Sequence, residues 1–212
     1  MDDRRFTQML TQIAADRKEN NFVNYIGVIG SRELPLSWKE KVQEVVRNLL
    51  AQGYGIASGG AMGADSFALE EVIRSGKSFR GIVFSAWDGI SGFPYEVRDQ
   101  IKEFARKGGR IDWGTVYQGA PRKDVVAGLF ARNRKLAENI TGLVAFAHGE
   151  AHLRQGFGGQ ARGTMYTVRE AMRRGKPAYV FQTSADRLVK LFRVTNTATK
   201  CECNEPLLQI AG

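Results

Sequence analysis

Residues 25–30 read YIGVIG, a short apolar run that ends in glycine. Such a run is typical of a strand buried on both faces of a parallel sheet. From residue 38 to residue 51 apolar side chains recur at helical spacing, and Gly53 follows as a glycine that ends a helix. Residues 54–58 then form a second predicted strand. We therefore expect the folded domain to begin at residue 23 with a strand–helix–strand unit.

The same alternation continues along the chain. The patterns predict helices over 65–75, 95–106, 123–139 and 164–174, and strands over 79–85, 110–113, 142–147 and 178–182. Strands separated by helices are typical of βαβ units in a parallel sheet. We predict one Rossmann-like α/β domain over residues 23–194, with helices on both faces of the sheet and a last short helix at 186–194. An amphipathic helix over 3–19 fills the N-terminal segment 1–22, and residues 195–212 form a tail without periodicity.

The composition excludes several classes of protein. A chain of 212 residues with 43% hydrophobic and 25% charged residues is not disordered. Its apolar runs fall short of the roughly 18 residues of a membrane helix, and no secretory signal is recognisable. We expect a cytoplasmic protein that does not enter membranes. Cys201 and Cys203 are too close for a disulfide framework, and neither they nor His148 and His152 form a metal-ligand pattern, so no metal site is predicted.

The charge is distributed unevenly. Residues 1–100 carry 12 Lys and Arg against 13 Asp and Glu, a balance of −1, whereas residues 101–212 carry 19 against 9, a balance of +10. A surface that faces phosphates requires such an excess. The alternative is a basic, solvated surface without a specific partner.

Ligands of open parallel sheets lie outside the carboxyl ends of the strands, so the residues that follow each predicted strand are candidates for a site. The first strand is followed by Gly30, Ser31 and Arg32. Glycine lets the backbone approach a ligand, and a guanidinium grips phosphate with two hydrogen bonds. A turn glycine and a solvated arginine are the alternative interpretation.

The second strand is followed by SGGAMGAD at residues 58–65, which opens a helix. The three glycines let backbone N–H groups converge on an anion, and the helix N-terminus adds partial positive charge. We predict a phosphate cradle from Ser58, Gly59, Gly60, Met62 and Gly63, with a tight turn that holds no ligand as the alternative. Asp65 either caps the helix or binds a sugar hydroxyl.

Two further groups belong to the same predicted edge. Arg132, Asn133 and Arg134 lie on the helix before the strand at 142, where Arg134 points away from Arg132, so the cluster can serve a pocket and the outer surface. The neighbouring Phe130 is assigned to the core. Gly163 and Thr164 start the helix that follows the loop 148–163 and present a second group of donors. Two such groups fit a nucleotide or a nucleic-acid backbone.

These motifs, in this order, resemble the DNA-processing protein A (DprA, or Smf) family, a Rossmann-like superfamily shared with the Lonely-Guy proteins. The resemblance covers residues 24–182 and includes the turn at 93–95 and the segment 163–167. It implies a dimeric protein that binds single-stranded DNA in a basic pocket and helps to load a RecA-type recombinase, without catalysis or cofactor. The pocket would use Arg32, the backbone of Gly59, Gly60 and Gly63, and the side chains of Arg132, Arg134 and Thr164. The family usually has arginine at the position of Met62.

Two alternatives remain beside DNA binding. A Lonely-Guy phosphoribohydrolase would cleave a nucleoside monophosphate, but its catalytic glutamate corresponds to Thr167 in this chain. The nearest glutamate, Glu170, lies about one helical turn away, roughly 5.4 Å along the axis. The other alternative is a sensor that binds a small nucleotide without converting it, which leaves the basic second half of the chain unexplained.

Overall fold

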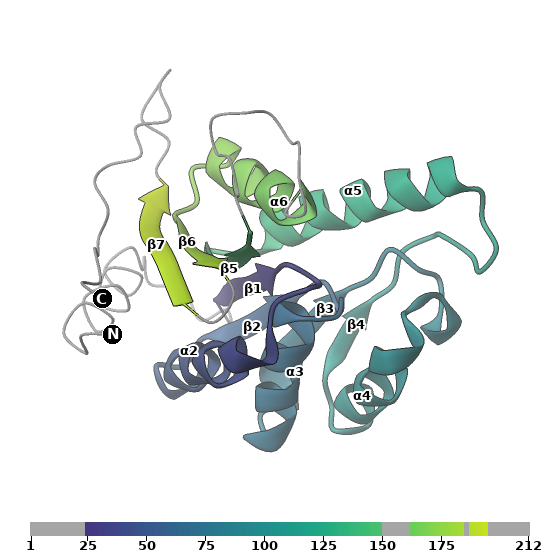
Figure 1. Cartoon of the computed structure of the whole chain (residues 1–212). Coiled ribbons are helices and arrows are strands. Elements are labelled where there is room, and N and C mark those ends of the chain that lie inside the picture. The colour runs from purple at the N-terminus through teal and green to yellow at the C-terminus, as the bar shows by residue number, and fades with distance from the viewer. Residues whose placement is uncertain (1–23, 150–161, 185–186, 195–212) are drawn as a thin grey trace.

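One seven-stranded sheet forms the centre of the molecule. The computed structural model describes residues 24–149, 162–184 and 187–194 (Figure 1). The strand order is β4-β3-β2-β1-β5-β6-β7, with six parallel strands and β7 antiparallel to β6. The strands are β1 (Tyr25–Gly30), β2 (Gly55–Ser58), β3 (Gly81–Phe84), β4 (Arg110–Asp112), β5 (Gly142–His148), β6 (Ala178–Ser184) and β7 (Arg187–Val194).

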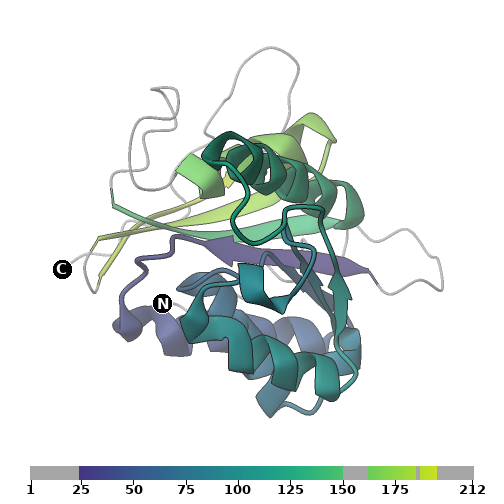
Figure 2. The same cartoon turned by 90° about the vertical axis from the view of Figure 1, so that its right-hand side faces the viewer.

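Helices cover both faces of the sheet (Figures 1 and 2). One face carries α2 (Lys39–Ala51), α3 (Ala64–Arg74) and α4 (Tyr95–Arg106), and the other carries α5 (Arg122–Asn139) and α6 (Arg162–Arg173). Short 3-10 turns lie at Leu36–Trp38, Ser78–Arg80 and Ile90–Gly92. The predicted Rossmann-like α/β fold is therefore confirmed. None of the helices in the described ranges has the length and hydropathy needed to cross a bilayer.

The alternation of side chains along β1 separates two apolar cores. Ile26 and Val28 pack under α2 and α3, whereas Ile29 faces the opposite core with residues of α5, β5 and α6. Gly27 also faces this second core, where an added Cβ would lie 2.6 Å from Leu143 Cδ1 of β5 and 3.4 Å from Leu136 Cδ2 of α5. The glycine therefore lets the α5 layer approach β1 closely.

The prediction at the end of the domain is wrong. Residues 186–194 were expected to form a short helix, but Arg187–Val194 is a strand. It pairs along the whole of β6, from Ala178 opposite Val194 to Ser184 opposite Arg187. A short apolar run fits either structure, and the free edge of β6 decides in favour of the strand. The predicted helix over 3–19 and the tail 195–212 lie outside the described residues.

The strand order reverses between β1 and β5. From β1 the chain adds β2, β3 and β4 on one side, and then returns to place β5 on the other side. The carboxyl ends of these two strands are joined through Ser31, whose N–H donates to Phe146 O at 2.9 Å and whose Oγ accepts from His148 N at 2.9 Å. Sheets of this kind hold their ligands in the crevice at such a reversal.

The two halves of α5 differ in burial. The buried residues of this helix are Asn133, Leu136 and Ala137, all in its second half. The first half extends beyond the sheet (Figure 1). Phe130, which we assigned to the core, is 39% exposed. That assignment is wrong because the sheet ends before it reaches this turn of the helix.

Candidate functional site

Two neighbouring cavities lie at the carboxyl ends of β1, β2 and β5. The larger, of about 480 Å³, has a polar side made of Gly30, Ser31, Arg32, Glu33, Asp65, Arg132, Asn133, His148, Gly163, Thr164 and Thr167, and an apolar side contributed mainly by α5. The smaller, of about 260 Å³, is lined by Gly59, Gly60 and the aromatic side chains of Trp87, Phe93 and Tyr95. Arg32 and Arg132 line both cavities. The two arginines therefore stand at the centre of the site.

Asp65 holds the glycine-rich loop in place. Its carboxylate is 3% exposed and accepts hydrogen bonds from the N–H groups of Gly59 at 2.9 Å, Gly30 at 3.2 Å and Ala61 at 3.4 Å. The amides that Asp65 binds all lie outside α3, so Asp65 does not cap this helix. Its oxygens instead bind the backbone next to two strand ends.

The amides of the loop are largely used within the protein. Besides the amides that Asp65 binds, Gly60 N–H donates to Ser58 Oγ at 3.3 Å. Gly63 has φ of +72°, and an added Cβ there would collide with Ser31 O. The loop therefore differs from the open cradle that we predicted, because a buried carboxylate occupies the position of the expected anion. The loop therefore contributes to the cavities because its glycines leave room for neighbouring side chains.

Gly59 provides the space for Arg132. A Cβ at residue 59 would overlap Arg132 Nη1. The Arg132 side chain is 11% exposed, and its Nη1 lies 4.0 Å from Asp65 Oδ2, at the limit of an ion pair. Its Nε is buried without a hydrogen-bond partner in the described part of the chain. The guanidinium is therefore held in the wall between the cavities with its donors largely unused.

The electrostatics of this pair follow from burial. Burial lowers the pKa of the Arg132 guanidinium; Asp65 opposes the shift and the charge of Arg32 adds to it. Burial also raises the pKa of the Asp65 carboxyl, against the effects of Arg132 and the three amides. A guanidinium stays protonated in proteins even so. A buried cation with free donors is stabilised by an anion that enters the cavity.

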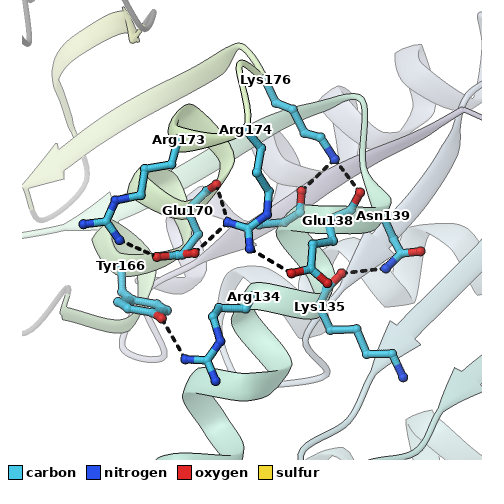
Figure 3. A network of polar contacts seen from close by, with 10 residues as sticks. Arg134, Lys135, Glu138, Asn139, Tyr166, Glu170, Arg173, Arg174 and Lys176 are labelled. Atoms are coloured by element: carbon cyan, nitrogen blue, oxygen red, sulfur yellow. Dashed lines mark hydrogen bonds and ion pairs between the residues drawn. The ribbon is translucent and has the colours of Figure 1, made fainter. Parts of the chain in front are cut away.

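The structure brings most of the predicted site residues together and leaves others out. Thr164 and Asn133, both buried, join the first-strand motif in the larger cavity. Ser58, Met62 and Gly63 line neither cavity. Arg134 is exposed on the outer side of α5, where its Nη1 donates to Tyr166 Oη at 3.2 Å (Figure 3). Arg134 thus lies outside both cavities, as its helical position predicts, and not in the pocket that the family resemblance implied.

Several residues of the site were missed from the sequence. Thr167 lies one turn after Thr164 on α6 and lines the larger cavity, with its hydroxyl donating to Gly163 O at 3.0 Å. Helical spacing from Thr164 is the signal that would have found it. Trp87 precedes the 93–95 turn and gave no signal, because only the fold returns it to the glycine-rich loop.

The residues do not support the hydrolase alternative. Glu170 lines neither cavity and is bound by Arg173 at 2.7 Å and Arg174 at 2.6 Å (Figure 3). Its carboxylate therefore contributes to the packing of α6. Within residues 24–149, 162–184 and 187–194, no three His, Cys, Asp or Glu side chains gather as metal ligands would.

A largely parallel sheet with an arginine-walled cavity at its strand-order reversal defines a Rossmann-like domain with a candidate ligand site. The family model described as DNA recombination-mediator protein A matches residues 15–199, and the chain belongs to this family. The resemblance that the motifs suggested is thus confirmed. No curated protein matches the chain.

Three solved structures are similar in fold. DNA processing protein A from Helicobacter pylori, described for its single-stranded DNA binding mode, is 23% identical with a TM-score of 0.54 over 74% of this chain and 65% of its own. The Streptococcus pneumoniae protein is 22% identical, with a TM-score of 0.52 over 75% of this chain and 50% of its own. A molybdenum cofactor binding protein from Rippkaea orientalis is 16% identical, with a TM-score of 0.51 over 77% of this chain and 79% of its own. The chain thus spans about two thirds and one half of the two DNA processing proteins.

Proposed function

We propose that this protein binds single-stranded DNA through its phosphates at the carboxyl edge of the sheet. The observation that carries the proposal is Arg132, a buried guanidinium that lies 4.0 Å from Asp65 and has an Nε without a partner. A phosphate that enters either cavity completes these hydrogen bonds. Arg32 adds a second guanidinium at the same opening.

The charge of the chain and the family support a polyanionic ligand. The excess of +10 in residues 101–212 attracts many phosphates, whereas one small nucleotide does not require it. The family is described as a recombination mediator, and its Helicobacter pylori member is described as binding single-stranded DNA.

The test is the fluorescence anisotropy of a labelled single-stranded oligonucleotide at several salt concentrations. If three or more phosphates are neutralised, affinity falls at least about tenfold between about 50 and 200 mM salt. Arg132→Ala is expected to cost about 2–3 kcal/mol of binding free energy, roughly 30- to 150-fold, for all sequences alike. Arg106→Ala, which removes an exposed arginine from α4, is the matched control. A flat salt response, or equal binding by the two variants, contradicts the proposal.

A nucleotide sensor is the second candidate, because a cavity of about 480 Å³ has the size of small-molecule sites. Calorimetry separates the two candidates. Heat from a nucleoside monophosphate, with no gain in affinity for an oligonucleotide, favours the sensor. Stronger binding of the oligonucleotide favours DNA binding.

The family suggests a cellular role. We propose a homodimer that acts in DNA processing and recombination in the cytoplasm, together with a RecA-type recombinase and without a cofactor or catalysis. Light scattering tests the dimer. Faster recombinase assembly on single strands in the presence of the protein tests the partnership, and the Arg132→Ala variant is expected to lose that effect.

A further inference from the structure

We propose that the smaller cavity is a pocket for one unstacked nucleobase, whose own phosphate is held by Arg32 and Arg132. The inference rests on the proposed function and adds a site for a base to the site for phosphates. The pocket lies between the loop that follows β3 and the first half of α5, and Arg132 stands in the wall that it shares with the larger cavity.

Aromatic side chains of increasing exposure line this pocket. Phe93 is buried, Trp87 is partly exposed and Tyr95 is 81% exposed. The cavity therefore offers aromatic surface both in its interior and at its rim. Proteins stack the unpaired bases of single strands on such side chains, because every base has a π-face.

The surrounding backbone holds Trp87 in place. Its N–H donates to Ser85 Oγ at 2.9 Å, and its carbonyl accepts from Gly114 N–H at 2.8 Å. Gly92 lies directly against the indole, since an added Cβ there would lie 2.3 Å from Trp87 Cγ. An indole that is already ordered loses little conformational entropy when a base stacks on it.

Arg98 on α4 holds the turn that carries Phe93. Its Nε donates to Phe93 O at 2.8 Å, and its Nη2 donates to Ser91 O at 2.5 Å. Although Arg98 lines the cavity, these two donors are used by the turn. Arg98 is therefore a positioning residue of the pocket, and Arg32 and Arg132 supply the charge for a ligand.

The size and the charge of the cavity together fit a nucleotide. A volume of about 260 Å³ is below the roughly 300–1,000 Å³ of sites that enclose a drug-sized ligand, so the cavity fits one part of a larger molecule. Among the described residues that line it, three are arginines and none is acidic. A base joined to its phosphate combines a flat aromatic group with an anion. An aromatic side chain of a protein partner carries no such anion.

The experiment compares a strand of twelve thymidylates with a strand of twelve abasic tetrahydrofuran units, which keeps the phosphates and removes the bases. Fluorescence anisotropy measures the binding of each labelled strand to the wild type, to Trp87→Leu and to Trp87→Phe. The wild type is expected to bind the thymidylate strand about fivefold or more tightly than the abasic strand. Trp87→Leu is expected to lose most of this preference without losing affinity for the abasic strand. Trp87→Phe, which keeps an aromatic face, is expected to retain part of the preference.

Trp113 offers a matched control. It is 43% exposed, lies edge-on to Phe93 with ring centroids 6.1 Å apart, and lines neither cavity. Trp113→Leu is expected to keep the preference of the wild type. The chain has three tryptophans, of which Trp38 is buried, so Trp87 is the exposed indole that remains in this variant. The thymidylate strand is expected to quench the tryptophan fluorescence of Trp113→Leu, and the abasic strand to leave it unchanged.

The outcomes separate this inference from the proposed function. If the wild type binds both strands equally, or if Trp87→Leu keeps the full preference, the base pocket is wrong and phosphate binding stands. If the wild type binds neither strand, both are wrong. If the wild type shows no preference while N-acetyltyrosinamide quenches Trp87, the cavity receives a protein side chain and the inference is overturned. The comparison of the two strands on the wild type does not depend on how the variants fold.

Discussion

Two buried carboxylates of this molecule are paired with arginine in opposite ways. Glu170 on α6 has a side chain 6% exposed and accepts hydrogen bonds from Arg173 and Arg174, whose own side chains reach solvent. Asp65 is equally buried, but its partner Arg132 is buried too and approaches only to 4.0 Å. Backbone amides satisfy Asp65 instead. The first arrangement satisfies the carboxylate within α6, and the second leaves a buried guanidinium with unused donors.

The largest expected effect comes from removing Asp65. Asp65→Ala leaves three backbone donors and the buried Arg132 without their acceptor, so the free energy of unfolding is expected to fall by about 3–5 kcal/mol. Urea denaturation measures it. The matched change Glu170→Ala is expected to cost less, because its arginines return to water. Equal losses for the two variants would remove the distinction between the two pairs.

The next largest effects are expected from substituting two glycines next to Asp65 and Arg132. Gly63→Ala places a Cβ against Ser31 O at a positive φ, so we expect a loss of at least about 2 kcal/mol of stability. Gly59→Ala displaces the end of the Arg132 side chain and places its Cβ 2.9 Å from Asp65 Oδ2. It is expected to lose less stability than Gly63→Ala and to lose about 1–2 kcal/mol of DNA-binding free energy. Urea denaturation measures the stability of both variants, and fluorescence anisotropy measures their DNA binding. A larger loss of stability for Gly59→Ala than for Gly63→Ala contradicts the prediction.

The pH dependence of Glu170 sharpens the comparison further. Burial raises the pKa of this carboxyl, but hydrogen bonds from Arg174 and Arg173 outweigh it, so the pKa lies below its ordinary value of 4.5. A lowered folded-state pKa gives stability that is present above the unfolded value and is lost as the pH falls through the folded value. Glu170→Gln is therefore expected to cost about 1–2 kcal/mol at pH 7. The difference from wild type should shrink below pH 4.5, and a difference that grows there is the contrary result.

The smallest effect belongs to a cluster of charged side chains at the surface. Hydrogen bonds from Arg106 and Lys107 lower the pKa of Glu103 to about 2. This carboxylate lies at the surface of α4, so solvent screens its interactions. Glu103→Gln is expected to leave the midpoint of thermal unfolding close to that of the wild type at pH 7, and to match it below pH 2. A larger effect than that of Glu170→Gln would show that burial does not decide the strength of these pairs.

The sheet was predictable because its strands are buried runs separated by helices of regular spacing. The β1 pattern and the glycine-ended runs depend on local sequence, and the structure places them as expected. Which strand pairs with which, however, does not depend on local sequence alone. Arg187–Val194 carries a pattern that suits a short helix, and only the neighbouring edge of β6 makes it a strand.

The site was predictable in its location but not in its internal bonding. Parallel topology brings Arg32, Arg132 and Thr164 to one edge, so residues after strands are the right candidates. The sequence does not reveal that the Asp65 carboxylate takes the loop amides from a ligand. It also does not reveal where the sheet stops beneath α5, which leaves Phe130 partly exposed.

Because Arg132 lines both cavities, their occupancies are linked. The planar fork of one guanidinium aligns with one anion at a time. Two separate ligands therefore compete for it even when neither touches the other, whereas a single molecule long enough to enter both cavities avoids this antagonism. Under the proposed function, the wall between the cavities therefore favours a chain of phosphates over its separate units.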